Sequence, residues 1–547
     1  MLLTSFPVES IAAIVILTII VHLLRNKYSN GIHHIPGPLF ASFTDLYRLY
    51  LAWTGNTQTH HLRLHKKHGP IVRLGPRTVS INDPDAHRTI YGIKSGFTKS
   101  AFYPVQATVA KGQTLQSLFN TRDEGFHARL RRAVASGYAM STLVEFEPLV
   151  DSTITAFLGQ LEERYAGVET GTLHERKKKE EETGEALCDF GQWLQFYAFD
   201  VIGELTFSKR LGFVERGEDV DGIIGNLEWL LRYGAVIGQL PILDRLFLKN
   251  PLRLWLSSLG YLNSSSPVVK FSQTRMHMGS QDETTANTSR SSSKSNPDPQ
   301  QPSPGPPGPP QRRDFLTRFL EAQKKDPEFI TNQKVLTLTV TNMFAGSDTT
   351  AISLRAIFYN ILRNADVQQR LTAEISALRR QQGPDGYLKW TLLSEAPYLS
   401  AVIKESLRCH PAVGLLLERI VPTTGLHACG YDIPAGTIVG CNAWVLHQNE
   451  EIFAPDPGSF MPSRWIDADK EQRRLMDGAL FSFGAGARSC IGRNVSLLEM
   501  YKLVPAVLER FELELADPDR EWKLFNAWFV KQSEFYVRIS RRDPRQG

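Results

Sequence analysis

The segment from Phe481 to Gly492 reads Phe-Ser-Phe-Gly-Ala-Gly-Ala-Arg-Ser-Cys-Ile-Gly and presents one thiol in a glycine-rich loop. Because glycine has no Cβ, Gly484 and Gly486 let the backbone pass close to a flat ligand. An apolar run at helical spacing follows, so Cys490 lies where a helix begins. The free N–H groups and the positive end of the helix dipole are expected to favour its thiolate. Such a loop could give one sulfur ligand to a metal; the alternative is a glycine-rich turn with an inert, buried cysteine.

A second candidate centre interrupts the long apolar helix predicted over residues 331–363, at Ala345-Gly-Ser-Asp-Thr-Thr350. Gly346 costs about 1 kcal/mol relative to Ala in a helix, and Asp348 and Thr349 compete with its backbone hydrogen bonds. Three such residues together indicate a role other than stability. We expect a notch in which Gly346 admits a small ligand and the acid–alcohol pair passes protons. A kink whose acid faces water is the alternative.

Charged residues at helical spacing form two further motifs. His127 and Arg131 share one face of the helix predicted over residues 124–138. Glu405-Ser-Leu-Arg408 is followed by Phe-Met-Pro-Ser-Arg464-Trp. Taken alone, the first motif is typical of an exposed basic helix. A surface pair like the second contributes only about 0.2–0.5 kcal/mol.

In this order, the four motifs resemble those of the cytochrome P450 family over nearly the whole chain. The resemblance implies a mainly α fold with small β-sheets (α+β), in which haem b lies between the long central helix and the cysteine loop. It makes Cys490 the iron ligand. The other cofactor-binding residues that it implies are Phe483, Gly484, Gly486, Arg488, Gly492, Ala345, Gly346, His127, Arg131 and Arg419. His127 stands where the family usually has Trp, and His-x-x-x-Arg-Arg looks like the fungal pisatin-demethylase-like branch.

The resemblance also implies roles outside the cofactor site. Asp348 and Thr349 would guide protons to bound dioxygen, and Phe525-Asn-Ala-Trp528-Phe529 would line the substrate pocket. The set formed by Glu405, Arg408 and Arg464 would be structural, with Glu405 between two guanidinium groups.

The activity implied is that of a haem–thiolate monooxygenase that hydroxylates, O-dealkylates or epoxidises a small lipophilic substrate in fungal secondary metabolism. Electrons would come from NADPH through NADPH–cytochrome P450 reductase, with cytochrome b5 as a further donor, because no nucleotide-binding glycine motif is evident in the chain. The alternatives are a detoxifying monooxygenase and a haem–thiolate isomerase or dehydratase. A non-catalytic haem sensor is a remoter one.

Residues 1–27 are predicted to be a signal-anchor helix. The apolar core at residues 11–24 would span about 21 Å, short of the roughly 30 Å hydrocarbon core, and counting back to Leu2 includes Glu9 and Pro7. A cleaved signal peptide is the alternative, but no basic residue precedes the run. Arg25 and Lys27 follow it, which predicts one pass through the endoplasmic reticulum membrane with the catalytic domain in the cytosol.

The rest of the chain is expected to be a proline-rich hinge at residues 28–40 and one catalytic domain at 41–547. A Ser/Pro-rich stretch at about 279–312 is predicted to be a disordered insertion. Pro505 is expected to break the helix after the cysteine loop. The net charge of +5 is too small to indicate nucleic acid. The five scattered cysteines support neither a disulfide framework nor a zinc cluster, so a reducing compartment fits best.

Overall fold

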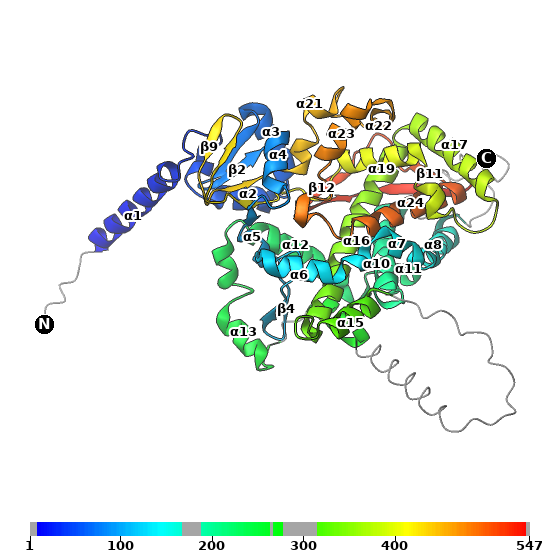
Figure 1. Cartoon of the computed structure of the whole chain (residues 1–547), viewed down its shortest axis with the longest axis horizontal. Coiled ribbons are helices and arrows are strands. Elements are labelled where there is room, and N and C mark those ends of the chain that lie inside the picture. The colour runs from blue at the N-terminus through cyan, green and yellow to red at the C-terminus, as the bar shows by residue number, and fades with distance from the viewer. Residues whose placement is uncertain (1–7, 167–186, 263–265, 277–313, 543–547) are drawn as a thin grey trace, which may run out of the picture.

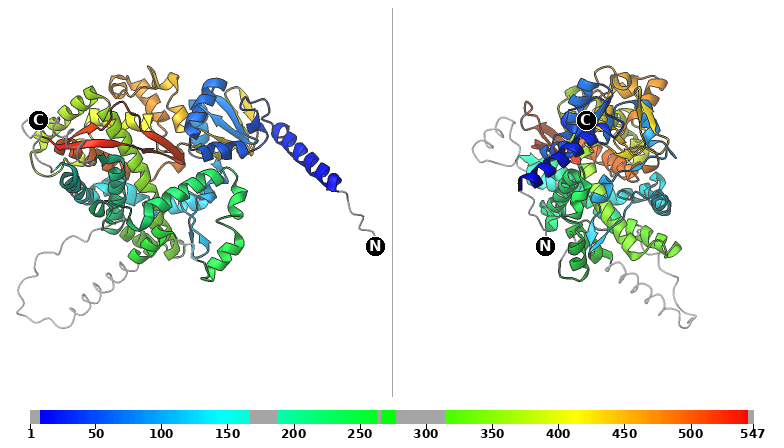
Figure 2. Two further views of the ribbon diagram at one scale, coloured as in Figure 1. Left: turned by 180° about the vertical axis from the view of Figure 1, so that it is seen from behind. Right: turned by 90° about the vertical axis from the view of Figure 1, so that its left-hand side faces the viewer.

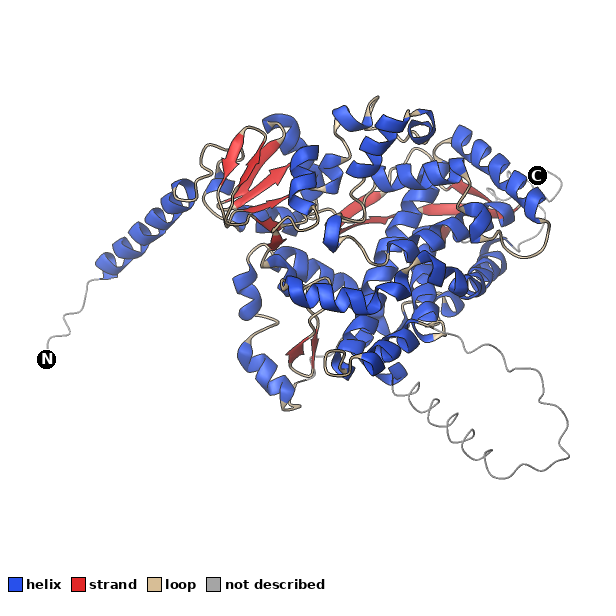
Figure 3. Cartoon of the chain, in the orientation of Figure 1, coloured by secondary structure: helices blue, strands red, loops and turns tan. Residues whose placement is uncertain are grey.

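The computed structural model describes residues 8–166, 187–262, 266–276 and 314–542, so the predicted insertion at about 279–312 lies outside the described residues. The described part is mostly helical, with small β-sheets, as predicted (Figure 1, Figure 3). Its long helices in the body are α8 (Glu147–Leu161), α10 (Phe190–Phe207), α12 (Ile223–Ile237), α16 (Asn332–Leu362), α17 (Ala365–Gln382), α19 (Pro397–Cys409) and α24 (Arg493–Arg510).

Helix α16 runs through the centre of the molecule (Figure 1, Figure 2) and packs against α10, α19 and α24. Its partner α10 is apolar on all sides, and every residue except Gln192 and Phe207 is buried, as expected for a helix enclosed by others. The predicted interruption of α16 does not occur. The helix is continuous, and the hydroxyl of Thr349 donates to the carbonyl of Ala345 (2.7 Å), so it bonds within the helix instead of ending it.

The largest sheet has five strands in the order β1-β2-β10-β7-β3. Its strands are β1 (Ile71–Gly75), β2 (Thr78–Ile81), β3 (Thr98–Lys99), β7 (Arg419–Ile420) and β10 (Ile438–Gly440). The segment before it packs on this sheet: Ile32 and Ile35 are buried, and the backbone N–H of Arg73 donates to the carbonyl of Pro36 (2.7 Å). The predicted hinge is therefore held against the body.

The remaining strands form one three-stranded sheet and three hairpins. The sheet joins β11 (Phe511–Leu515), β14 (Tyr536–Arg541) and β6 (Cys188–Asp189). The hairpins are β4 (Val109–Ala110) with β5 (Gln113–Thr114), β8 (Leu426–Ala428) with β9 (Tyr431–Ile433), and β12 (Lys523–Ala527) with β13 (Phe529–Ser533). Shorter helices include α2 (Leu46–Thr54), α3 (Thr57–His68), α4 (Pro84–Tyr91), α5 (Phe102–Val105), α6 (Glu124–Val134), α13 (Pro251–Ser258), α15 (Phe315–Lys325), α20 (Ala443–Leu446), α22 (Ser463–Asp467) and α23 (Lys470–Ala479).

Helix α24 continues through Pro505 to Arg510, so the prediction that this proline breaks the helix is wrong. A proline removes one backbone hydrogen bond from a helix interior. Its neighbours Val504 and Val507 are fully buried, and this packing offsets the loss.

Glu499 on α24 is fully buried, and neither carboxyl oxygen has a hydrogen-bond partner among the described residues. Burial raises the pKa of Glu499 well above its ordinary value. The folded state therefore retains a proton that the unfolded state releases. The contribution of Glu499 to the free energy of unfolding is greatest below the ordinary glutamate pKa. Above that pKa, this contribution falls by up to about 1.4 kcal/mol per pH unit.

Glu499→Gln is expected to remove this pH dependence, because the amide is neutral at every pH. Melting temperatures measured between acidic and neutral pH should fall less in the variant than in the parent. Glu512→Gln, at an exposed position of β11, is the matched control and should melt like the parent. If the melting temperatures of the parent and of Glu499→Gln fell equally with rising pH, the prediction would be contradicted.

Helix α1 (Val8–Tyr28) extends away from the body (Figure 1) and is joined to it only near its C-terminal end, where Arg73 donates to the carbonyls of Asn26 (2.9 Å) and Lys27 (3.0 Å). Its 21 residues would be about 31 Å long, enough for a hydrocarbon core of roughly 30 Å. The segment Glu9–Tyr28 has a mean hydropathy of 1.6, with none of its apolar window buried. The helix is therefore longer than the apolar core predicted at residues 11–24.

Candidate functional site

The cysteine loop is closed by its own backbone. Gly484 and Gly486 have positive φ angles of 65° and 62°, and the N–H of Cys490 donates to the carbonyl of Phe483 (2.8 Å). A Cβ at Gly486 would lie 1.8 Å from the carbonyl oxygen of Tyr91, so only glycine fits. A Cβ at Gly492 would be 3.9 Å from the Cys490 sulfur. The loop therefore presents an exposed Cys490 just before α24.

The electrostatic prediction for this thiol is wrong in its net direction. The side chain of Cys490 is exposed in front of the loop, but the protein around it leaves the sulfur poorly solvated. This desolvation raises the pKa of Cys490, and the effect exceeds the lowering by the backbone N–H of Gly492 and by the nearby Arg131. Without a metal the sulfur is therefore a thiol at neutral pH. A metal ion would have to displace its proton, as metal-binding thiols generally require.

The start of the loop is fixed by hydrogen bonds to α19. The hydroxyl of Ser482 donates to the carbonyl of Leu407 (2.7 Å). His447 joins the carbonyl of Arg408 through Nδ1 (2.9 Å) and the N–H of Phe481 through Nε2 (2.8 Å). Burial lowers the pKa of His447 to about 3, so the ring is neutral, with one tautomer that satisfies both bonds. His447 was not predicted from sequence, because no motif marks it.

The predicted structural set forms a buried network behind this loop. The carboxylate of Glu405 accepts two hydrogen bonds from Arg408 (2.8 and 2.9 Å), one from the backbone of Met461 (2.9 Å) and one from the indole of Trp465 (2.9 Å). Arg464 lies 3.4 Å from the same carboxylate. The side chains of Glu405 and Arg408 are fully inaccessible. The remaining guanidinium donors bind backbone carbonyls: Arg408 those of His447, Pro457 and Ser459, and Arg464 those of Phe453, Pro455 and Asp456.

Two of the predicted cations lie at the cysteine loop, Arg488 within it and Arg131 beside it. Arg131 on α6 donates to the carbonyl of Ser489 (2.7 Å), next to Cys490. The side chain of Arg488, only 5% exposed, pairs with Glu124 at the start of α6 (2.7 Å). The structure therefore brings α6 and the cysteine loop together, as the sequence predicted.

A further cation, Lys99, was missed from sequence. It is the cross-strand partner of Arg419, since β3 pairs with β7 in antiparallel register. Both side chains are buried, at 4% and 5% exposure. Like charges directly opposite each other destabilise a sheet unless an anion offsets them. No carboxylate pairs with either among the described residues; Arg419 donates to Tyr103 (3.2 Å) and Lys99 to the carbonyl of Phe119 (2.5 Å).

These four cations surround His127, which is 4% exposed. Burial, then Arg488, Lys99, Arg131 and Arg419, lower the pKa of His127 to about 3. Burial and the positive charges of Arg419 and Arg488 also lower the pKa of Lys99 well below its ordinary value. Such a buried cluster, next to an exposed thiol, is suited to a ligand that carries negative charge.

The acid–alcohol pair on α16 points in two directions. Asp348 is 2% exposed and accepts a hydrogen bond from Gln195 of α10. Ala345 is exposed and Thr349 half-buried, although they lie in the middle of a mostly buried helix. Thr350 bonds Ser496 of α24 (2.8 Å), so this part of α16 lies beside the helix that follows Cys490. The exposed side of Ala345 and Thr349 is therefore available to a ligand at the cysteine loop.

The structure gives a packing reason for Gly346. A Cβ at this position would lie 2.9 Å from Ile202 of α10, so the missing side chain allows α10 and α16 to pack closely. The helix pattern alone could not reveal this, because it does not say which neighbour each face meets. The approach of a ligand to the backbone of Gly346 stays a prediction.

The three predicted pocket residues differ in burial: Phe525 lies on β12, Trp528 in the hairpin turn and Phe529 on β13. Trp528 is 2% exposed and stacks on Phe102, with ring centroids 4.8 Å apart. Phe529 packs partly buried in the same cluster, which includes Tyr103 and hence adjoins Arg419. Phe525 is instead 40% exposed on β12 and lies near Arg232, which contradicts its placement in the pocket.

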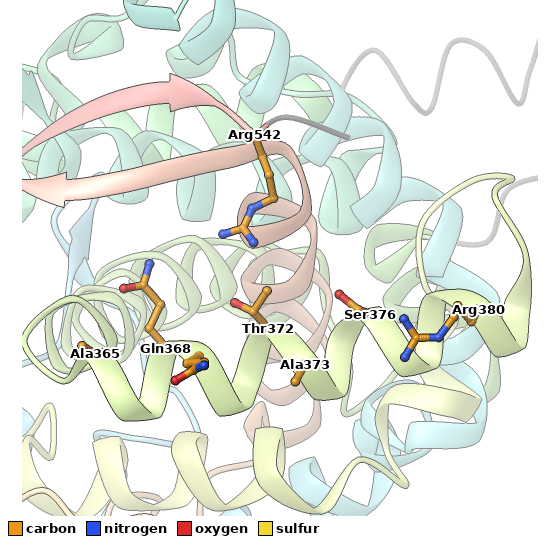
Figure 4. Close-up of a pocket in the computed structure, with 8 residues that line it drawn as sticks. Ala365, Gln368, Thr372, Ala373, Ser376, Arg380 and Arg542 are labelled. Atoms are coloured by element: carbon orange, nitrogen blue, oxygen red, sulfur yellow. The ribbon is translucent and has the colours of Figure 1, made fainter. Parts of the chain in front are cut away.

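A hollow of about 480 Å³ lies elsewhere, on an open face of α17 (Figure 4). Thr372, Ser376 and Arg380 line it, together with Arg542 after β14, and it includes none of the predicted site residues. This groove is therefore not the chemical centre.

The residues at the cysteine loop fit haem b. An exposed thiol at a helix start suits iron, glycines allow a flat ring to approach, and two buried like charges in adjacent strands suit its two carboxylates. The described residues contain no group of three or more His, Cys, Asp or Glu side chains that could hold a metal ion by themselves. The fold and the site thus define a haem–thiolate class of protein.

The comparisons with known proteins agree. The family model described as Cytochrome P450 matches residues 35–538. A cytochrome P450 monooxygenase of Aspergillus terreus is 38% identical, with 92% of this chain and 94% of that protein covered. The monooxygenase cicH of Emericella nidulans is 37% identical (93% and 94% covered), and one of Aspergillus flavus is 34% identical (93% of each). The chain belongs to the cytochrome P450 family and is a monooxygenase, and this membership implies a haem cofactor.

Proposed function

We propose that the protein oxidises a small lipophilic molecule of fungal secondary metabolism, with electrons from NADPH delivered by NADPH–cytochrome P450 reductase and, in a supporting role, cytochrome b5. The observation that carries the proposal is the exposed Cys490 next to the buried cations Lys99 and Arg419. His127-x-x-x-Arg131-Arg, with the histidine buried, is the basis for proposing the pisatin-demethylase-like branch.

Haem would be held by the Cys490 sulfur and by the cation cluster. Lys99, Arg131, Arg419 and Arg488 would neutralise the propionates, and His127 would regain a proton beside them, since a nearby anion raises its pKa. Bound there, haem supplies activation of dioxygen, and thiolate ligation favours O–O cleavage. The protein contributes orientation, electrostatics and exclusion of water.

Proton delivery is the proposed role of Thr349 and Asp348. Thr349 lies on the exposed side of α16 and keeps its hydroxyl oriented through the Ala345 carbonyl. Asp348 is buried behind it, and burial raises its pKa. A carboxyl group whose pKa is raised toward the working pH can both take up and release a proton.

Thr349→Ala is expected to leave the thiolate-ligated carbon monoxide spectrum intact while most of the electrons from NADPH emerge as hydrogen peroxide. The removed hydroxyl is small and half-buried, so folding should change little. Peroxide and NADPH consumption would be measured with reductase present. Thr372→Ala on α17, remote from the site, is the control. Unchanged coupling in Thr349→Ala would refute the proton-delivery role.

The lipophilic character of the substrate is inferred from the aromatic cluster around Trp528. Phe102, Tyr103 and Phe119 surround it, with ring centroids within 6.4 Å. The hairpin of β12 and β13 brings Trp528 and Phe529 beside Leu415 and Leu417. A spectral-shift binding screen of candidate metabolites against the purified protein is the experiment that tests substrate class; binding confined to highly polar compounds would overturn it.

We propose that α1 anchors the protein in the endoplasmic reticulum membrane with the body in the cytosol. The exposed helix and the basic residues at its end support this orientation. Exposed apolar side chains lie on or next to α2 and α13, which are on the same side of the body as α1 (Figure 1), and this supports contact with lipid. These side chains are Phe40, Tyr50, Trp53, Phe247, Leu252 and Trp255.

Two further proposals concern the body. The reductase would dock beside the cysteine loop, where Arg132 and Arg493 are exposed, whereas Arg129 is engaged with Asp326 (2.8 Å). Residues 41–547 would form one catalytic domain, with 279–312 as an insertion.

A haem–thiolate isomerase or dehydratase is disfavoured by the acid–alcohol pair, which such reactions do not need. A detoxifying monooxygenase differs only in substrate and would be recognised by broad binding in the same screen.

A further inference from the structure

Asp348 is held by a residue outside every sequence motif. Gln195, on α10, is 2% exposed, and its amide nitrogen donates to the Asp348 carboxylate. The amide oxygen of Gln195 accepts from Arg355 Nη2 (3.0 Å) and from Lys531 Nζ (2.9 Å). The reversed amide would place its N–H groups against two cations and its oxygen against a carboxylate. The orientation is therefore fixed by its partners.

Lys531, the second donor to the Gln195 oxygen, lies partly at the protein surface. Lys531 on β13 is 29% exposed and forms an ion pair with Glu228 on α12, which is 45% exposed. The Nε of Arg355 donates to the carbonyl of Gly191 (2.8 Å), which holds the first cation in place. Polar contacts thus run from Asp348 through one amide to a solvent-exposed ion pair.

We propose that Gln195 is a positioning residue for Asp348 and couples it electrostatically to the Lys531–Glu228 ion pair. This inference rests on the proposed role of Asp348 in proton delivery. A direct bond from Asp348 to Lys531 would hold the acid permanently as a carboxylate. The intervening neutral amide fixes the position of the acid and transmits the field of the cation, yet leaves the acid able to protonate.

The charged groups around Asp348 act with opposite signs. Burial raises the pKa of Asp348, Lys531 and Arg355 lower it, Glu228 raises it and the Gln195 hydrogen bond lowers it. These groups come from β13, α16, α12 and α10, which are the elements that supply its charged and hydrogen-bonding neighbours. Removing each group should therefore shift the midpoint of the Asp348 titration in a direction that its charge predicts.

Three variants of the full-length holoprotein test the proposal. Gln195→Leu should raise the midpoint of Asp348, since the hydrogen bond to its carboxylate is lost. Lys531→Met should also raise it, and Glu228→Gln should lower it. The readout is the infrared carbonyl band of the protonated acid, titrated with pH and assigned by its absence in Asp348→Asn.

Gln192→Leu is the matched control, because it makes the same amide-to-leucine change at an exposed position of α10. Its midpoint should equal that of the parent. A parental midpoint in Gln195→Leu, or shifts of the same sign in Lys531→Met and Glu228→Gln, would overturn the proposal. If the buried Gln195→Leu variant fails to fold, Lys531→Met and Glu228→Gln still test the electrostatic coupling, because they should shift the Asp348 midpoint in opposite directions.

The titration needs neither substrate nor reductase, so it succeeds or fails independently of the proposed function. Coupling of NADPH use is measured separately. If the shifts occur but Asp348→Asn leaves coupling unchanged, the positioning stands and the proton-delivery role falls. If coupling depends on Asp348 but the midpoints do not move, the proton-delivery role stands and the positioning by Gln195 falls.

Discussion

Replacing Cys490 by Ser is expected to abolish the strongly red-shifted Soret band of the ferrous carbon monoxide complex. This band is the signature of thiolate ligation, and the exposed Cys490 at the start of α24 is the residue that would supply the thiolate. A serine hydroxyl is nearly isosteric but a far poorer ligand for iron at neutral pH. Haem content should fall and any residual spectrum should lose the thiolate signature, while monooxygenase activity disappears.

The other cysteines provide the control. Cys429, half-buried in the turn between β8 and β9, can be changed to Ser without touching the loop, and the band should persist. A parent protein whose carbon monoxide complex resembles that of a globin would contradict the assignment of Cys490. So would a Cys490→Ser variant that keeps the red-shifted band.

Replacing Glu405 by Ala is expected to prevent accumulation of the folded haem protein. The change leaves Arg408 and Arg464 buried without their shared carboxylate, and it orphans the Met461 N–H and the Trp465 indole. Breaking a buried ion pair costs about 3–5 kcal/mol, out of a typical total stability of about 5–15 kcal/mol. Because Arg408 also holds His447, which bonds the start of the cysteine loop, haem binding should fail together with folding.

Soluble yield, haem content per chain and thermal unfolding would measure this effect. Glu395→Ala, an exposed position just before α19, removes the same side chain without burial and should match the parent. A Glu405→Ala protein with parental haem content and melting temperature would show that the network contributes little.

Local motifs were the part of the site that the sequence could predict. The cysteine loop depends on residues a few positions apart, whose φ angles and cap geometry follow from their own types, as at Gly484 and Gly486. The pair of Glu405 and Arg408 is likewise set by one turn of helix. The mainly helical fold with small sheets followed from the same local patterns and from the family resemblance.

The wrong predictions concern positions whose structure depends on contacts with residues distant in the sequence. Pro505 lies in a helix kept intact by packing. Phe525 faces outward because it alternates on β12 with the buried Asn526, whereas Trp528 lies in the turn after this strand. The pKa of the Cys490 thiol is raised because desolvation by the surrounding protein has a larger effect on it than the N–H groups at the start of the helix.

The sequence by itself determined the chemistry: one cysteine in a glycine loop, an acid–alcohol pair and a buried ionic network. Only the tertiary structure decided the electrostatics around them. Lys99 faces Arg419 because two distant strands pair, and Gln195 reaches Asp348 because two helices pack. Motif residues are read from local spacing, whereas charge coupling depends on distance in space and on burial, which arise only when distant segments of the chain come together.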